Sequence, residues 1–274
     1  MSADPPLRSP ALLQALTAAT ARACTAIMQM RRAGANVRLK ADGSPVTAAD
    51  EAADAIIGEA LEKLLPGLPV ISEESFAAGR CADISGGVFA LIDPLDGTRE
   101  FIAGRDAFTT NIALLADNRP VLGVIGAPAS GRIWRGTTGG GADRLSIGAD
   151  GVSVSAPEPV RVRAAQAGDV TAVVSRSHLD ADTVAFLDAR GIAKRVAAGS
   201  SLKFCRLAQG EADIYPRLAP INEWDIAAGH AILEAAGGII LTEDGSSPRY
   251  GRLDRDLRVP SFIAYGDRTL AAAR

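Results

Sequence analysis

The chain contains 274 residues, of which 47% are hydrophobic and 22% charged, and its net charge is −3 at pH 7. This length fits one large or two fused domains with a sizeable core. The charge balance, without a basic stripe, argues against a nucleic-acid partner. Three cysteines and two histidines are too few for a disulfide framework or a histidine-based zinc site.

The location expected from the sequence is the cytoplasm, where core or semi-buried cysteines stay reduced. The first residues lack the charged-then-apolar pattern of a signal peptide, and no apolar run reaches the roughly 18 residues that span a bilayer. We therefore expect no transmembrane segment. Peripheral association with the inner face of the cell membrane is left open.

Hydrophobic periodicity predicts two helices, over residues 10–32 and 47–65. Thr47 and Asp50 have the spacing of a capping box at the start of the second helix. The next elements expected are strands at 70–71 and 88–92, a hairpin of strands 109–116 and 121–127, and a strand with a turn over 131–141. The glycine run at 139–141 lacks the Lys-Ser/Thr of a phosphate loop and is interpreted as a turn.

A connection that bears serine and proline, over residues 153–159, is the candidate domain boundary. We expect an N-terminal α+β half over 1–152 and a C-terminal α/β half over 153–274. In the second half strands and helices alternate, which predicts helices layered on a sheet. The expected elements are strands 172–175, 195–197, 212–215, 239–242 and 261–265, helices 180–190, 201–209 and 224–236, and a short terminal helix.

The most informative motif is Asp-Pro-Leu-Asp-Gly-Thr at residues 93–98, directly after the apolar run 88–92. Such a run is typical of a buried strand, so two carboxylates emerge together at its end. Asp93, Asp96 and the carbonyl of Leu95 form an all-oxygen set suited to a hard cation such as Mg²⁺. A simple turn explains less, because two unpaired acids there would raise one another's pKa.

Gly97 and Thr98 open the following segment with free backbone N–H groups, which bind phosphate well. The Thr98 hydroxyl could relay a hydrogen bond between a metal-bound water and Asp50 or Glu73, and an ordinary helix N-cap is the alternative. The motif therefore predicts a combined metal and phosphate site.

Further acids lie at the ends of predicted elements. Glu73 follows a short strand, and Asp50 and Asp225 lie in the first turns of helices, where capping and the helix dipole alone could explain them. Together with Asp93 and Asp96, Glu73 and Asp225 provide four carboxylates. Two Mg²⁺ ions would cancel their charge, and an oxygen-only set favours Mg²⁺ over Zn²⁺.

Three segments in this order resemble the lithium-sensitive, Mg²⁺-dependent phosphomonoesterases of the inositol monophosphatase superfamily. They are Ser-Glu-Glu at 72–74, the motif at 93–98, and Trp-Asp-Ile-Ala-Ala-Gly at 224–229. The resemblance extends from about Gly43 to Tyr265. Within the superfamily the chain is most similar to the 3′(2′),5′-bisphosphate nucleotidases of the CysQ type. Four segments carry this similarity: Thr-Arg-Glu-Phe at 98–101, Ser-Arg-Ser-His at 175–178, Gly-Ser-Ser-Leu-Lys-Phe-Cys at 199–205 and Tyr-Pro-Arg at 215–217. It departs from many relatives at Asp143, where they place an aromatic residue.

The resemblance implies the layered α/β/α/β/α sandwich of the inositol monophosphatase and fructose-1,6-bisphosphatase type. It assigns metal and phosphate binding to the first half, and Asp225 and the nucleotide pocket to the second. The implied catalytic residues are Asp50, Glu73 and Thr98. The implied ligands of two Mg²⁺ ions, with a third ion left open, are Glu73, Asp93, Leu95, Asp96 and Asp225. The implied substrate contacts are Glu73, Leu95, Asp96, Gly97, Thr98, His178, Ser200, Lys203, Arg217 and Asp225.

The activity implied by the resemblance is hydrolysis of adenosine 3′,5′-bisphosphate to AMP and phosphate, with 3′-phosphoadenylyl sulfate also admitted as a substrate. The expected partner is a small-molecule nucleotide, and the expected assembly is a monomer or homodimer. One alternative is an inositol monophosphatase or sugar (bis)phosphatase with the same metal site, which Arg99, Lys203 and Arg217 would favour if they pointed away from it. Another is a non-catalytic regulator that binds metal and nucleotide, which would be expected to lack a metal ligand or Thr98.

Overall fold

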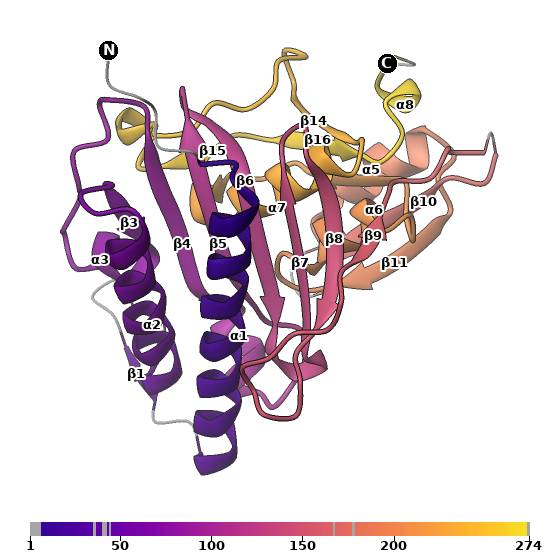
Figure 1. Cartoon of the computed structure of the whole chain (residues 1–274). Helices are drawn as coiled ribbons and strands as arrows, with labels where there is room; N and C mark the ends of the chain where they lie inside the picture. Colours follow the sequence, from indigo (N-terminus) through magenta and orange to yellow (C-terminus); the bar gives the residue numbers. More distant parts are fainter. Residues whose placement is uncertain are drawn as a thin grey trace.

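Two β-sheets form the framework of the molecule (Figure 1). The computed structural model describes residues 7–34, 37–39, 43, 45–166, 168–176 and 179–272. The first sheet has seven strands in chain order: β3 (Val70–Ser72), β4 (Phe89–Asp96), β5 (Thr109–Ala116), β6 (Arg119–Ala127), β7 (Arg132–Thr137), β8 (Gly141–Ser146) and β9 (Glu158–Val160). Strands β3 and β4 are parallel, and the other neighbours are antiparallel.

The second sheet has five strands in the order β11-β10-β12-β16-β14. They are β10 (Thr171–Ser175), β11 (Lys194–Ala198), β12 (Ile214–Arg217), β14 (Ile239–Thr242) and β16 (Phe262–Tyr265). Strand β10 is parallel to β11 and β12, whereas β16 is antiparallel to β12 and β14. Two short antiparallel pairs complete the strands: β1 (Val37–Leu39) with β2 (Pro45–Thr47), and β13 (Ile221–Asn222) with β15 (Arg258–Val259).

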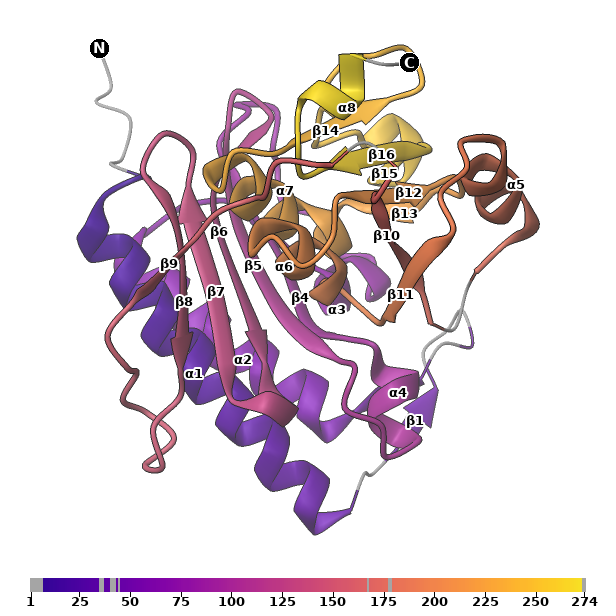
Figure 2. The ribbon, with the colours of Figure 1, turned by 90° about the vertical axis from the view of Figure 1, so that its right-hand side faces the viewer.

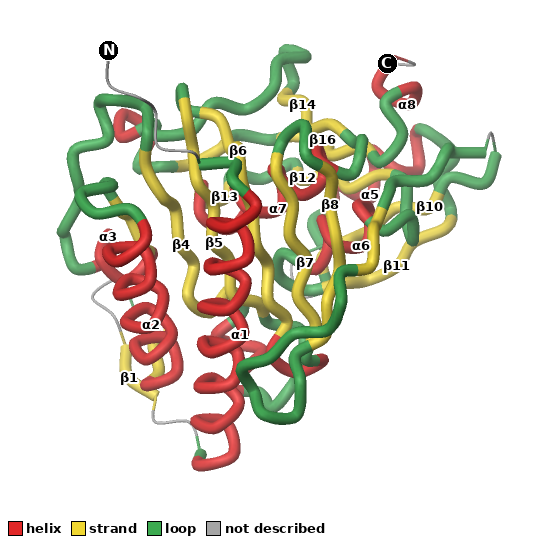
Figure 3. Tube along the Cα trace, in the orientation of Figure 1, coloured by secondary structure: helices red, strands yellow, loops and turns green. Residues whose placement is uncertain are grey.

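The helices separate and cover these sheets (Figures 2 and 3). Helices α1 (Pro10–Ala33) and α2 (Ala48–Leu64) cover one face of the seven-stranded sheet, and α6 (Leu202–Ala208) and α7 (Glu223–Ala235) lie between the two sheets. Helices α5 (Ala181–Ala189) and α8 (Thr269–Ala272) pack on the outer face of the second sheet. Short helices α3 (Glu73–Ala77) and α4 (Thr98–Ile102) follow β3 and β4. The predicted α/β/α/β/α sandwich is therefore confirmed.

Helix α7 lies very close to its neighbours because the contacting residues are small. A Cβ atom on Gly123 of β6 would lie 2.3 Å from the carbonyl oxygen of Ala228, and a Cβ atom on Gly229 would lie 2.3 Å from the ring of Phe204. Both distances are shorter than any van der Waals contact. Strands β4 to β6 are buried on both faces by this packing, which explains their continuous apolar runs.

Most predicted elements are present within a few residues of their expected bounds. Thr47 caps α2, and the predicted capping box with Asp50 is formed. Gly139 and Gly140 lie in the turn between β7 and β8, as predicted, and Gly141 begins β8. Asp143 on β8 forms a 3.7 Å ion pair with the buried Arg135 of β7. The two-half division at residue 152 stays a prediction, and β9 extends the first sheet to Val160.

Two expectations from composition need correction. Among the described residues, α1 is long and apolar enough to cross a membrane by length and composition, with a mean hydropathy of 1.3. Half of its most apolar stretch is buried in the fold, and core helices of soluble proteins meet the same criterion, so this is weak evidence for a membrane. Cys24 and Cys205 are buried as expected, but Cys81 is exposed, because it lies in the loop that follows α3.

Candidate active site

Strand β4 does not end at Ile92, as expected, but continues through the acidic motif to Asp96. Its register against β5 shifts between Asp93 and Asp96, which bends the strand. The Leu95 N–H donates to the Asp93 carboxylate at 3.1 Å, and the Thr110 hydroxyl donates to the carbonyl of Pro94 at 2.9 Å. These bonds fix the motif against the sheet.

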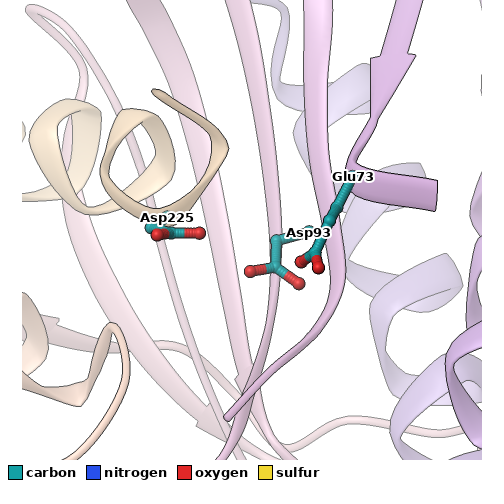
Figure 4. Close-up of side chains that lie close together, drawn as sticks. All are labelled: Glu73, Asp93 and Asp225. Carbon is teal, nitrogen blue, oxygen red and sulfur yellow. The ribbon is translucent and has the colours of Figure 1, made fainter. Parts of the chain in front are cut away.

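Glu73, Asp93 and Asp225 converge from three elements (Figure 4). Glu73 begins α3, Asp93 lies on β4, and Asp225 lies in the first turn of α7. One carboxylate oxygen from each can be chosen so that all three lie within 4.8 Å of one another. Two oxygens on opposite sides of a Mg²⁺ ion lie about 4.2 Å apart, since each binds at about 2.1 Å. The three side chains can therefore share one ion after small adjustments.

The electrostatics of this cluster also fit a cation. Burial raises the pKa of Asp93 well above its usual value, and the charges of Glu73, Asp96 and Asp225 raise it further. Burial likewise raises the pKa of Asp225, with repulsion from Asp96 and Glu73 added. Several carboxylates held together in this way are stable as anions only beside positive charge. The donors are all oxygen, so a hard divalent cation fits the residues present.

Asp96 lies beside these three carboxylates and is held by polar groups from β5 and from the 199–203 turn. Burial raises its pKa, and the opposing influences come from the charge of Lys203 and from hydrogen bonds of Ser201 and Asn111. The Ser201 hydroxyl donates to the carbonyl of Asp225 at 2.6 Å and accepts from the Asn111 amide at 3.0 Å. Ser201 therefore links the two aspartates through one buried side chain.

Thr98 and Asp50 form the predicted pair. The Thr98 hydroxyl lies 3.1 Å from the Asp50 carboxylate and 3.1 Å from the Leu95 carbonyl. Asp50 is buried, and its other oxygen accepts from the backbone N–H and the hydroxyl of Thr47 at 2.7 and 2.6 Å. Asp50 thus both caps α2 and orients Thr98, so its two interpretations from the sequence are not exclusive.

Gly97 and Ser200 bring two turns into direct contact. Gly97 has φ +93°, and a Cβ there would lie 2.5 Å from the Ser200 hydroxyl. Ser200 itself has φ +51°, which is strained for a non-glycine residue. Its hydroxyl donates within 3.0 Å to the carbonyls of Asp96 and Ala107. The Ser200 side chain, expected to face a nucleotide, is therefore engaged in holding the 96–97 turn.

A cavity of about 540 Å³ opens over the cluster. All four predicted metal-binding carboxylates line it, together with Leu95, Gly97, Thr98, Ser200, Lys203 and Arg217. Arg99 lines it as well, as does Arg258, which we did not predict. His178 lies outside the described residues. Asn111 and Ser201 were also missed, although an asparagine inside the apolar run 109–116 was a signal that could have found the first of them.

Lys203 is buried on the inner wall of this cavity. Its ammonium donates to the Ser200 carbonyl at 2.7 Å and lies 5.3 Å from the centre of the Tyr215 ring. Burial lowers its pKa to about 8, with the Asp96 charge opposing this shift. Arg217 contributes a second positive charge at the same wall, and its Nε donates to the Ala219 carbonyl at 3.1 Å.

Comparison with known proteins identifies the class to which this fold and site belong. The family model described as "Inositol monophosphatase family" matches residues 9–273. The chain belongs to the inositol monophosphatase family.

Within this family, several of the similar proteins carry the name CysQ. The 3′(2′),5′-bisphosphate nucleotidase CysQ of Escherichia coli strain K12 is 39% identical over 235 residues, which cover 81% of this chain and 88% of that protein. The protein of the same name from Buchnera aphidicola subsp. Acyrthosiphon pisum is 37% identical, over 84% of this chain and 82% of its own. The crystal structure of CysQ from Bacteroides thetaiotaomicron matches with a TM-score of 0.73 and 34% identity, covering 93% of this chain and 96% of that one.

Proposed function

We propose that this protein is a Mg²⁺-dependent phosphatase that hydrolyses adenosine 3′,5′-bisphosphate to AMP and phosphate, with 3′-phosphoadenylyl sulfate as a further candidate substrate. The observation that carries the proposal is that one cavity combines four carboxylates, the Gly97–Thr98 turn and the cations Arg99, Lys203 and Arg217. The similarity to the CysQ nucleotidases over most of the chain supports the same substrate class.

The cationic wall favours a bisphosphate over an inositol or sugar monophosphate. A bisphosphate ester carries a second dianion, which needs positive charge at a distance from the metal site. Lys203 on α6 and Arg217 on β12 reach the cavity from the second half of the chain, whereas the acidic motif lies on β4 of the first sheet. Since Arg99, Lys203 and Arg217 all line the cavity, the alternative that requires them to point away loses its support.

We assign Glu73, Asp93, the Leu95 carbonyl, Asp96 and Asp225 as the groups that hold two Mg²⁺ ions, with a third ion left open. Divalent cations bound there would act as Lewis acids that polarise the phosphoryl group and activate the attacking water. The backbone N–H groups of Gly97 and Thr98, at the start of α4, orient the scissile phosphate.

Thr98 and Asp50 orient the attacking water. Because the Thr98 hydroxyl donates its own hydrogen to Asp50 or to the Leu95 carbonyl, its oxygen is left to accept a hydrogen bond from a water in the cavity. Glu73 accepts from the same water on the other side. Together these groups align the water for in-line attack on phosphorus.

The proposal extends to the setting of the enzyme. We propose a cytoplasmic enzyme that acts on a small nucleotide as a monomer or homodimer, with a first half that binds metal and phosphate and a second half, from residue 153, that contributes Asp225 and the nucleotide wall. Apart from the weak signal of helix α1, the described residues carry no feature that supports a peripheral location on the membrane. The net charge of −3 fits the absence of a nucleic-acid partner.

The test is phosphate release from adenosine 3′,5′-bisphosphate, inositol 1-phosphate and fructose 1,6-bisphosphate, each with and without Mg²⁺. We expect a Mg²⁺-dependent preference for the nucleotide of at least tenfold in kcat/KM. A preference for inositol or sugar phosphate would keep the metal site and refute the substrate. No release from any of the three would favour the non-catalytic regulator.

Lys203→Ala should raise KM for adenosine 3′,5′-bisphosphate while changing KM for 3′-AMP, which lacks the second phosphate, by less than about threefold. A hydrogen bond to a charged partner contributes about 1.5–3 kcal/mol, so the expected rise is about tenfold or more. The matched control is Lys194→Ala, which removes an exposed lysine of β11 that pairs with Asp169. Equal rises for both substrates would show that Lys203 does not contact the second phosphate.

A further inference from the structure

A second cavity adjoins the candidate active site, and one residue lines both. This cavity has a volume of about 310 Å³, enough for a phosphate or sulfate group with its water, and four arginines line it: Arg249, Arg252, Arg255 and Arg258. Arg258 also lines the catalytic cavity, beside Arg217 and Asn222. The two cavities therefore meet at the Arg258 side chain.

Arg258 is positioned by elements that also build the catalytic site. It lies on β15, directly opposite Asn222 of β13, and Asn222 precedes α7 and its Asp225. The neighbouring Leu257 is fully buried, and its carbonyl accepts the N–H of Glu223 at 2.8 Å. Arg258 thus projects from a fixed backbone.

The segment of residues 249–258, which carries the four arginines, is also anchored to α7. The buried carboxylate of Glu223 accepts the backbone N–H groups of Gly251 and Arg252 at 2.6 and 2.9 Å. These bonds tie the loop that carries the arginines to the first turn of α7. A ligand bound here would therefore meet a preformed site at a defined distance from Asp225.

Two carboxylates, Glu243 and Asp244, also line the cavity, so four arginine charges face two negative charges there. One oxygen of Asp244 accepts the Thr242 hydroxyl and both the N–H and the hydroxyl of Ser246, and Glu243 accepts the hydroxyl of Ser261. Asp254 pairs in a bidentate manner with Arg252 at 2.8 and 2.7 Å.

The remaining arginine charges are available to an anion. Arg249 donates from one nitrogen to the Asp117 carbonyl, and among the described residues no carboxylate pairs with it. Within the described part of the chain, the exposed Arg258 side chain forms no hydrogen bond or ion pair. Guanidinium groups in this state favour phosphate and sulfate oxygens, which they bind in a bidentate geometry.

We propose that Arg258, with Arg249 and Arg255 beyond it, forms a second anion subsite that takes a terminal phosphate or sulfate group. Two sources share this chemistry. One is a group carried beyond the 5′-phosphate of the nucleotide, as in a 5′-diphosphate, and this form rests on the proposed function. The other is free inorganic phosphate, which is also a product of the proposed reaction.

The test measures binding of AMP, the nucleotide product of the proposed reaction, and of ADP, which carries one further phosphate beyond the 5′-phosphate, by calorimetry in the presence of Mg²⁺. Wild-type protein should bind ADP at least tenfold more tightly than AMP, since the added phosphate gains charge-assisted hydrogen bonds. Arg258→Ala should reduce this ratio to about one. Arg258→Lys should retain part of it, because charge remains but the bidentate geometry is lost.

A second experiment, which measures the effect of inorganic phosphate on Tm, tests whether the subsite takes the free anion. If ADP and AMP bind equally to the wild type, but phosphate raises its Tm more than that of Arg258→Ala, the subsite takes the free anion. The control is Arg161→Ala, which removes an exposed arginine that lines neither cavity. Equal responses of the wild type, Arg258→Ala and Arg161→Ala in both experiments would overturn the subsite.

Hydrolysis is scored separately, so that the two proposals can fail independently. Retention of the ADP preference in a protein that releases no phosphate from any nucleotide would refute the proposed function and leave the subsite standing. Turnover of adenosine 3′,5′-bisphosphate without any effect of Arg258→Ala on ADP or phosphate binding would support the proposed function and refute the subsite.

Discussion

Asp93→Asn should abolish Mg²⁺-dependent turnover and, at the same time, stabilise the metal-free protein. The carboxylate lies at the centre of the cluster, where burial and three neighbouring acids raise its pKa. In the absence of a cation, its charge costs folding energy that a neutral amide of the same shape does not. We expect kcat to fall by at least about 10³-fold, corresponding to about 4 kcal/mol, and the free energy of unfolding without metal to rise by about 1–3 kcal/mol.

The measurements are phosphate release and chemical denaturation with EDTA or with Mg²⁺. In the wild type Mg²⁺ should raise the free energy of unfolding, and in Asp93→Asn this gain should be largely lost. Asp188→Asn, which changes an exposed carboxylate paired with Arg195, is the control for loss of charge alone. A variant that is less stable than the wild type without metal would show that Asp93 is not held against electrostatic repulsion.

Gly97→Ala should damage both stability and activity. The added Cβ would lie 2.5 Å from the Ser200 hydroxyl and 3.0 Å from the Ala107 carbonyl, at a residue whose φ is +93°. The left-handed backbone alone costs about 1–2 kcal/mol. The contact with Ser200 then forces apart the turns that carry Asp96 and Lys203, and a displacement of about 1 Å at reacting groups can cost about 10²-fold in rate.

Gly131→Ala separates these two effects. Gly131 also has a positive φ, +62°, but an added Cβ there would meet no atom within 4 Å. It should therefore show the backbone cost with normal kcat/KM, whereas Gly97→Ala should lose at least tenfold in kcat/KM beyond any loss of folded protein. Similar kcat/KM values for the two variants would mean that the contact between Gly97 and Ser200 does not position the site.

The parts of this molecule that were predictable from sequence are those with a local signal. Continuous apolar runs locate β4 to β6, helical periodicity locates α1 and α2, and the capping box at Thr47 is formed as predicted. The carboxylates at 93 and 96 were predictable because two acids adjoining an apolar run would raise one another's pKa unless a cation lay beside them. The roles of these residues in catalysis stay predictions.

The parts that were missed depend on contacts between distant segments. Ser201 contacts Asp96, 105 residues before it, and Asp225, 24 residues after it. Sequence periodicity does not predict contacts between such distant segments. Ser200 was expected to face a nucleotide, yet its hydroxyl holds the 96–97 turn. Strands β13 and β15 are two residues long, so Arg258 had no pattern that could place it beside the cavity.

The close approach of α7 to β6 has a consequence for the cluster at its end. The separation between Asp225 and Asp93 is determined less by the acids than by the thickness of the layer behind them, where Gly123 meets the backbone at Ala228. A single methyl group added there would push the whole helix outward, and Asp225 would move with it. The geometry of the charged site thus depends on glycine and alanine at buried positions outside it.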